Sequence, residues 1–158
     1  MNKTLIWTTL GCCLIALAAT VQGQNRKPGL WEVTSQVNMS MTGAPQMPAH
    51  TAQVCVTQAM IDKYGGPYSN PQAGPCQTSN IVKTPSGMTA NLTCSGRMTM
   101  TGTIQSTFVD ANTVKSTVQM TASMGASGQT MTMTVQATAT YKGPDCGDVK
   151  PIEIPASK

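Results

Sequence analysis

Strict alternation of apolar and polar residues is the feature that most constrains the fold of this chain. Between Leu30 and Thr42, apolar side chains occupy nearly every odd position, and the even positions from Glu32 to Ser40 are polar. Successive side chains of a β-strand point to opposite faces, so a period of two indicates a strand with one buried face. The same alternation recurs in five later segments: residues 52–56, 88–94, 98–108, 114–124 and 131–141. The chain is therefore predicted to be all-β.

The polar phase of the last strands consists almost entirely of Thr, Ser and Gln, so one face of the predicted sheet is dry and the other is wet. Parallel sheets are covered on both faces, and this pattern therefore predicts an antiparallel sheet. Short turns at residues 85–87, 110–112 and 125–128 predict a meander of hairpins. Because there is little helix to cover the apolar face, we expect the strands to curl into a barrel or half-barrel with the methionines inside. A two-sheet sandwich is the alternative.

Three stretches interrupt the alternation. Residues 57–64 predict one short helix, with Thr57 as its N-cap. The Gly- and Pro-containing stretches at residues 43–50 and 65–75 are expected to form loops. The tail from about residue 147 is expected to be disordered.

The first 23 residues are typical of a cleavable secretory signal peptide. Residues 5–19 are apolar, and Val21 to Gly23 offers small residues before a cleavage site at Gln24. An uncleaved membrane anchor is disfavoured because the apolar run is shorter than the about 20 residues that a bilayer requires. A lipoprotein is a further alternative, although the residues before Cys12 form a poor lipobox. We expect processing to leave a single β domain, residues 24–158, outside the cytoplasm, either periplasmic or secreted.

Four cysteines lie beyond this leader: Cys55, Cys76, Cys94 and Cys146. An even number of cysteines in a small exported domain predicts disulfides, and four cysteines allow three pairings. We favour Cys55–Cys76, which would close the loop after an early strand, together with Cys94–Cys146, which would fasten the chain end to a central strand. Each bond would contribute about 2–4 kcal/mol. A zinc site is poorly supported, because the chain has no C-x-x-C pair and a single histidine.

No set of catalytic residues stands out in the sequence. A Ser-His-Asp arrangement would require His50, which is expected in a proline-bounded loop, and the chain has no G-x-S-x-G motif. The carboxylates fall mostly at expected strand ends, turns or the tail: Glu32, Asp62, Asp110, Asp145, Asp148 and Glu153. Phosphate-binding glycine loops, EF-hand loops and dinucleotide fingerprints are also missing from the sequence. We therefore expect no enzymatic activity and no cofactor.

The net charge of +4 is weak and scattered along the chain. It does not indicate nucleic acid or anionic lipid as a partner. No segment beyond the leader is apolar for long enough to span a membrane as a helix. The expected partner is instead a small apolar ligand or a protein of the cell envelope.

Methionine is unusually frequent, with 12 among 158 residues. Three M-x-M pairs occur: Met39 with Met41, Met98 with Met100, and Met131 with Met133. Residues two apart in a strand point to the same face, and clustered thioethers can bind Cu(I), a soft ion that prefers sulfur ligands. A simpler interpretation is that methionine fills the apolar phase of the strands. A third is a loosely packed cavity for a lipid or another apolar ligand.

Several short motifs occur in a characteristic order along the chain: R-K-P-G-L-W-E-V at residues 26–33, V-C-V-T at 54–57, T-C-S-G at 93–96, M-T-M-T-G at 98–102 and G-P-D-C-G at 143–147. In this order they resemble a family of exported bacterial proteins catalogued as domain of unknown function 3617. The resemblance implies a Gram-negative periplasmic location and four paired cysteines. It implies no activity, ligand or catalytic residue.

Together these observations favour a non-enzymatic periplasmic protein that serves as a binding or structural module of the cell envelope. Its ligand would be a small apolar molecule or a protein partner. The alternative is a Met-rich protein that binds or handles Cu(I) in the periplasm.

Overall fold

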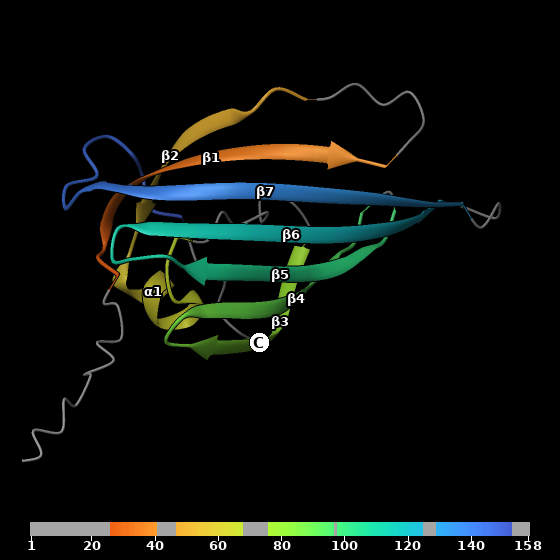
Figure 1. Ribbon diagram of the computed structural model, residues 1–158, viewed down its shortest axis with the longest axis horizontal. Helices are drawn as coiled ribbons and strands as arrows, with labels where there is room; N and C mark the ends of the chain where they lie inside the picture. Colours follow the sequence, from red (N-terminus) through yellow and green to blue (C-terminus); the bar gives the residue numbers. More distant parts are fainter. Residues whose placement is uncertain (1–25, 41–46, 68–75, 97, 125–128, 153–158) are drawn as a thin grey trace, which may run out of the picture.

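Seven strands and one short helix follow one another in the computed structural model, which describes residues 26–40, 47–67, 76–96, 98–124 and 129–152 (Figure 1). Their bounds are β1 Gly29–Met39, β2 His50–Val56, α1 Gln58–Tyr64, β3 Cys76–Thr84, β4 Gly87–Cys94, β5 Met100–Phe108, β6 Thr113–Met124 and β7 Gln129–Gly143. Each strand is antiparallel to its neighbours in the sheet. The predicted all-β, antiparallel fold is confirmed.

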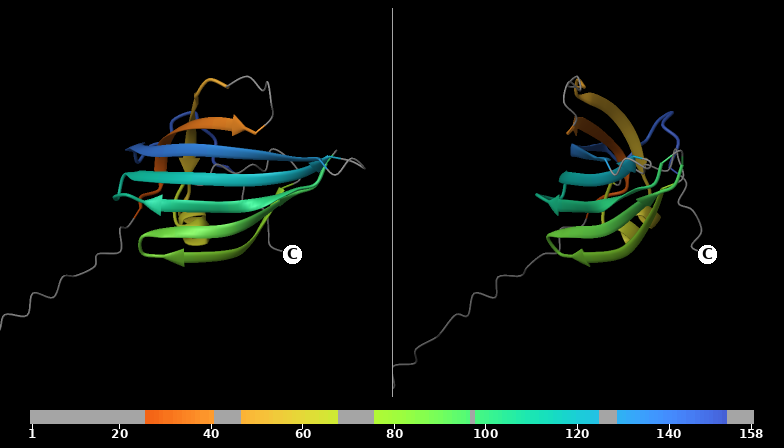
Figure 2. Two further views of the ribbon diagram at one scale, coloured as in Figure 1. Left: turned by 45° about the vertical axis from the view of Figure 1, so that its right-hand side comes forward. Right: turned by 90° about the vertical axis from the view of Figure 1, so that its right-hand side faces the viewer.

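The strand order across the sheet is β2-β1-β7-β6-β5-β4-β3. Strands β3 to β7 form the expected meander, and β1 returns to lie against β7 with β2 outside it. The sheet does not close, because β2 and β3 are its two edges. It curves strongly, and the right-hand view of Figure 2 shows an arc from β2 at the top to β3 at the bottom. Among the expected architectures the structure is therefore a half-barrel, and the described strands form no second sheet that would make a sandwich.

Helix α1 begins and ends as the sequence predicts. The side chain of Thr57, the N-cap, accepts a hydrogen bond from the Met60 N–H at 3.3 Å. The helix ends at Gly65, whose φ of 78° lies in the left-handed region and whose N–H donates to the Ile61 carbonyl at 2.7 Å. A Cβ on this glycine would lie 2.7 Å from the Phe108 ring, so both conformation and packing require glycine there.

The concave face of the sheet carries the hydrophobic core, which is concentrated at the end where β5 ends and β6 begins. Helix α1 lies at this end (Figure 1), with Met60 and Tyr64 buried in the same cluster as strand residues. Trp31 is fully buried in it. Its indole N–H donates to the Lys27 carbonyl at 3.1 Å, which satisfies the one polar group of this side chain. The Tyr141 ring packs edge-on against the indole at 5.4 Å.

The convex face is polar, as the alternation predicts. Because residues directly opposite each other in an antiparallel sheet share a face, the register defines rows of side chains that run across the strands. One convex row consists of exposed or half-exposed polar residues from β1, β7, β6, β5 and β4: Asn38, Thr134, Gln119, Thr103 and Asn91.

The disulfides are Cys76–Cys94 and Cys55–Cys146, so the favoured pairing of Cys55 with Cys76 and of Cys94 with Cys146 is wrong. Cys76 is the first residue of β3 rather than the end of a loop. The β3–β4 register places it directly opposite Cys94, with 3.8 Å between the Cα atoms. Cys146 follows β7, which is separated from β2 only by β1, and it therefore meets Cys55 at the other edge of the sheet.

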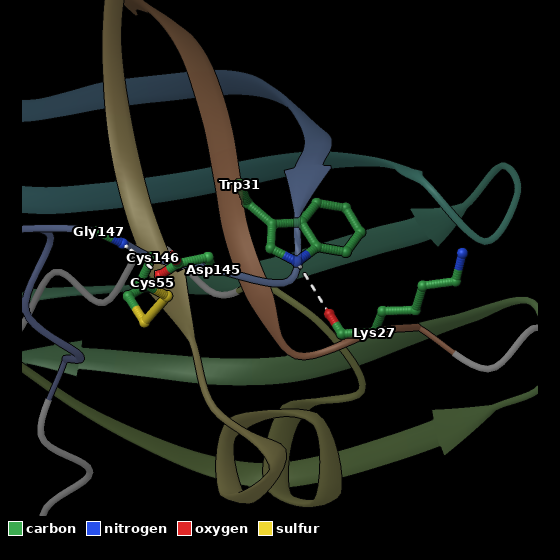
Figure 3. The surroundings of a disulfide bond; sticks show 6 residues. All are labelled: Lys27, Trp31, Cys55, Asp145, Cys146 and Gly147. Carbon is green, nitrogen blue, oxygen red and sulfur yellow. Dashed lines mark hydrogen bonds between the residues drawn. A yellow bond between two sulfur atoms is a disulfide. The ribbon is translucent and has the colours of Figure 1, made fainter.

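The Cys55–Cys146 bond holds the segment after β7 against β2 (Figure 3). Within this segment the Asp145 carboxylate accepts a hydrogen bond from the Gly147 N–H at 2.9 Å. Pro151 forms a parallel β-bridge with Cys55, and Ile152 packs against the core. Residues 147–152, which we expected to belong to a disordered tail, thus have a defined place. Residues 153–158 and the expected signal peptide, residues 1–23, lie outside the described part of the chain.

Candidate functional site

Helix α1 covers only one end of the concave face, and apolar side chains beyond it are partly exposed. One concave row crosses β1, β7, β6, β5 and β4: Val37, Val135, Val118, Ile104 and Ala90. Ile104 and Ala90 are buried, whereas the three valines are half-buried. The exposure of the concave face is therefore greatest on β1, β7 and β6.

The next two rows, farther from α1, are rich in methionine. Met133 on β7 lies directly opposite Met39 on β1 and also directly opposite Met120 on β6. Met131, two residues before Met133, shares its face and lies opposite Ala122. Residues directly opposite each other have Cβ atoms about 4.5–5.5 Å apart. Met39, Met120, Met131 and Met133 therefore form one methionine cluster from three adjacent strands.

Exposure differs within the cluster. Met120 is buried, with 8% of its surface exposed, whereas Met39 is 37% exposed, and Met131 and Met133 are half-buried. The cluster thus has a shielded side on β6 and an accessible side on β1. We use the name open concave surface for its accessible members together with the half-buried valines: Val37, Met39, Val118, Met131, Met133 and Val135.

The structure assembles the methionines differently from the M-x-M pairs of the sequence. Met98 precedes β5 and is exposed, so it does not share a strand with Met100. Met100 lies opposite Ala122, at the border of the cluster, and Met41 lies outside the described residues. Met120 was missed by the sequence reasoning, because it belongs to no M-x-M pair. Only the β6–β7 register shows that it faces Met133.

Among the described residues no three His, Cys, Asp or Glu side chains lie close enough together to hold a metal ion. His50 is exposed on β2, opposite Ser35, and Glu32 forms a surface ion pair with Lys142 at 2.8 Å. The buried hydroxyl of Ser106 forms a hydrogen bond with Ser116 at 2.8 Å.

Arg26 is a residue of unusual environment that the sequence reasoning did not single out. Its guanidinium lies 3.6 Å above the centre of the Phe108 ring, a cation–π contact near the helix-covered end. Burial lowers the pKa of this guanidinium. Its Nε and Nη1 atoms are buried and have no hydrogen-bond partner among the described residues. The contact joins the segment before β1 to the end of β5.

A shallow hollow of about 370 Å³ lies on the convex face, over β1, β7 and β6. Its outward-facing side chains are amides and hydroxyls with one ammonium group: Thr34, Gln36, Lys115, Thr117, Gln136 and Thr138. This polar hollow is on the opposite side of the sheet from the open concave surface. Separately, α1 is too short to cross a membrane, and no other described segment forms a helix long and apolar enough to do so.

Comparison with known proteins identifies a family for this chain. Neither a curated protein nor a solved structure matches the chain. A family model, in contrast, matches residues 26–146, from the arginine that lies over Phe108 to the cysteine that is bonded to Cys55. This match spans most of the chain and confirms the resemblance seen in the sequence. The chain belongs to the family described as "Protein of unknown function (DUF3617)".

Proposed function

We propose that this protein is a non-enzymatic binding module that holds an apolar ligand, such as an acyl chain, against its open concave surface. The observation that carries the proposal is the partial exposure of valine and methionine side chains on the inner face of a curved sheet. A concave surface contacts a ligand from more than one side, and apolar lining is the usual character of small-molecule sites. Transfer of each ligand methylene from water to such a surface is worth about 0.8 kcal/mol.

A row that contains hydroxyl groups lies between the open concave surface and the part of the core near α1. This row consists of Ser35, Ala137, Ser116, Ser106 and Met88. Strand formation on the concave face is thus compatible with serine, at the half-buried Ser35 and Ser116 and also at the buried Ser106. The valines and methionines of the next rows are not required merely to form strands, and this supports a binding role for them.

Methionine suits such a surface. Its unbranched side chain has three rotatable bonds and a polarizable sulfur, so it adapts to ligands of different shape. The accessible methionines Met39, Met131 and Met133 adjoin the three half-buried valines on the same face. Together they would accommodate a flexible chain better than a rigid ring system.

The proposed location is the periplasm, and two features support it. Disulfides persist in oxidising compartments, and this chain has two. The apolar stretch at residues 5–19 is typical of a secretory leader.

The first test is native mass spectrometry of the protein purified from its host, which is expected to show organic mass above that of the oxidised chain. The second is a titration with dodecanoate, followed by NMR of ¹³C-methyl-labelled methionine. We expect shifts at Met39, Met131 and Met133. We expect none at Met60 of α1 or Met88 of β4, both of which are buried.

A pair of matched variants makes this test specific. Val135→Thr keeps the shape of the side chain but places a hydroxyl on the open concave surface, and it is expected to weaken dodecanoate binding about 5–30-fold, or about 1–2 kcal/mol. Val82→Thr makes the same change at a residue of β3 that is 58% exposed, and binding should not change. Dodecanoate that causes no methyl shifts, or equal weakening by both variants, would refute the proposal. Purified protein that carries a polypeptide instead would identify a protein partner as the occupant.

A further inference from the structure

The cross-strand register places three thioethers in line across the sheet, in a way that no sequence motif reveals. Met39, Met133 and Met120 lie in one row on β1, β7 and β6, with Met133 directly opposite both of the others. Met131 lies one row away on the same face, diagonal to Met39 and Met120. Met133 is therefore the centre of the methionine cluster.

The spacing of this row allows several sulfurs to reach one ion. Neighbours that lie directly opposite each other have Cβ atoms about 4.5–5.5 Å apart. Each methionine Sδ lies two bonds beyond its Cβ, and the flexible side chain can turn the sulfur toward a point between two strands. Gly102, on β5, lies opposite Met120 and has no side chain to compete for the space beside it.

The chemistry of the cluster selects a soft ion. Thioether sulfur is uncharged and soft, and it prefers Cu(I) to hard or borderline divalent ions, which are held by carboxylates and imidazoles. Cys94, in the same row as Met131, is bonded to Cys76 and is therefore no thiolate ligand. His50 pairs with Ser35, four residues before Met39, which corresponds to about 13 Å along the strand. The nearest candidate ligands of the described residues are thus thioethers.

Exposure within the cluster fits an ion that enters from one side. Met39 is 37% exposed and Met120 is 8% exposed, so one end of the row faces solvent and the other is shielded from it. Shielding from water protects Cu(I) from competing ligands, and the exposed end gives access.

We propose that the methionine cluster binds one Cu(I) ion through the Sδ atoms of Met39, Met120 and Met133, with Met131 as an additional ligand. This site shares Met39, Met131 and Met133 with the open concave surface. Copper binding depends on the sulfur atoms of these side chains, whereas acyl-chain binding depends on their apolar surface.

The test is a competition titration of the oxidised full chain with the Cu(I) complex of bicinchoninate, without oxygen, after mass spectrometry has verified both disulfides. We expect one ion to transfer to each chain. Met133→Leu conserves side-chain volume and apolar character but removes the central sulfur. It should lower the Cu(I) affinity about 10–100-fold or more, because even groups that only support metal ligands have effects of that size.

Met88→Leu is the matched control, since Met88 is a buried methionine of the same face in the row nearer α1. It should leave Cu(I) affinity unchanged. A thioether takes up no proton in the ordinary pH range, so the affinity should also be the same at about pH 5.5 and about pH 7.5. A histidine ligand, with an ordinary pKa near 6.5, would lose affinity at the lower pH.

Three results would overturn the proposal: no transfer of copper from bicinchoninate, equal loss of affinity in Met88→Leu and Met133→Leu, or a steep fall in affinity at low pH. The folded state of each variant is checked by its methyl spectrum, so that loss of binding is not confused with unfolding. Dodecanoate binding by Met120→Leu distinguishes the two proposals, because Met120 is a proposed copper ligand that is buried and lies outside the open concave surface. Its replacement should lower the Cu(I) affinity and leave dodecanoate binding largely unaffected.

Discussion

Replacement of Cys55 and Cys146 with alanine is expected to destabilise the protein more than the same replacement of Cys76 and Cys94. Each double variant removes one disulfide and exchanges two cysteines for alanines, so the loss of side-chain burial is similar in the two. Their difference therefore reports mainly the constraint that each bond places on the unfolded chain.

The magnitude follows from the loops that the two bonds close. The sequence separation is 91 residues for Cys55–Cys146 and 18 for Cys76–Cys94. In the chain-entropy description these correspond to about 4.6 and about 3.2 kcal/mol at 25 °C. The smaller loop lies inside the larger one and shortens the path to a separation of about 73, which lowers the larger figure to about 4.4 kcal/mol. The expected difference in the free energy of unfolding is thus about 1 kcal/mol.

The segment after β7 adds to this difference. Cys146 holds residues 147–152 near β2, where Pro151 bridges to Cys55 and Ile152 packs against the core. Loss of the bond releases these contacts as well, so about 1 kcal/mol is a lower limit for the difference in the free energy of unfolding.

The assay is equilibrium unfolding in urea, followed by the fluorescence of Trp31, which is fully buried in the folded state. Peptide mapping of the unmodified protein by mass spectrometry should first show the pairs Cys55–Cys146 and Cys76–Cys94. The reasoning is refuted if the variant without Cys76–Cys94 is equally or more destabilised, provided that both variants unfold with the same dependence on urea.

Two further predictions concern local structure and use the same urea assay. Gly102→Ala should destabilise the protein by about 1–3 kcal/mol, because its Cβ would overlap the Gln119 carbonyl oxygen of the neighbouring strand. Gly143→Ala, where nothing lies within 4 Å of the new Cβ, should be neutral or stabilising by up to about 1 kcal/mol, and equal effects of the two variants would contradict the close approach. Thr57→Ala removes the hydroxyl that accepts a hydrogen bond from the Met60 N–H and should lower the free energy of unfolding by about 1 kcal/mol, whereas Thr57→Ser should lower it less. A neutral alanine variant would show that the cap does not stabilise α1.

The strands and the helix could be predicted because their determinants are local. Alternation of side chains is a property of each strand by itself, so β1 and β7 were recognisable without knowledge of their partners. The helix cap at Thr57 and the turn between β3 and β4 likewise depend on residues close in sequence. The curled sheet with a polar outer face follows from these patterns and from the small amount of helix, whereas the choice between a closed barrel and an open half-barrel does not.

Pairing between distant segments could not be predicted, because period-two patterns are alike in all strands and any two of them can pair. The contact of β1 with β7 joins the first and the last described strands, and nothing near either strand in the sequence specifies it. The predicted disulfide pairing was wrong for this reason, because Cys146 reaches Cys55 only through the contact of β7 with β1. The place of Met120 in the methionine cluster could not be predicted for the same reason, because it depends on the β6–β7 register.

The two proposed activities of the concave face can be separated because they depend on different properties of neighbouring side chains. At Met120, leucine removes a proposed copper ligand at a buried position outside the open concave surface, so copper binding should weaken while acyl-chain binding should stay the same. At Val135, threonine removes apolar surface and leaves every thioether in place, so the pattern should reverse. Val135 and Met120 lie on the adjacent strands β7 and β6 and face the same side of the sheet, so a general disturbance of this region would affect both activities in both variants. Reversal of the pattern between these neighbours would therefore show that copper binding depends on thioether sulfur and that acyl-chain binding depends on apolar surface.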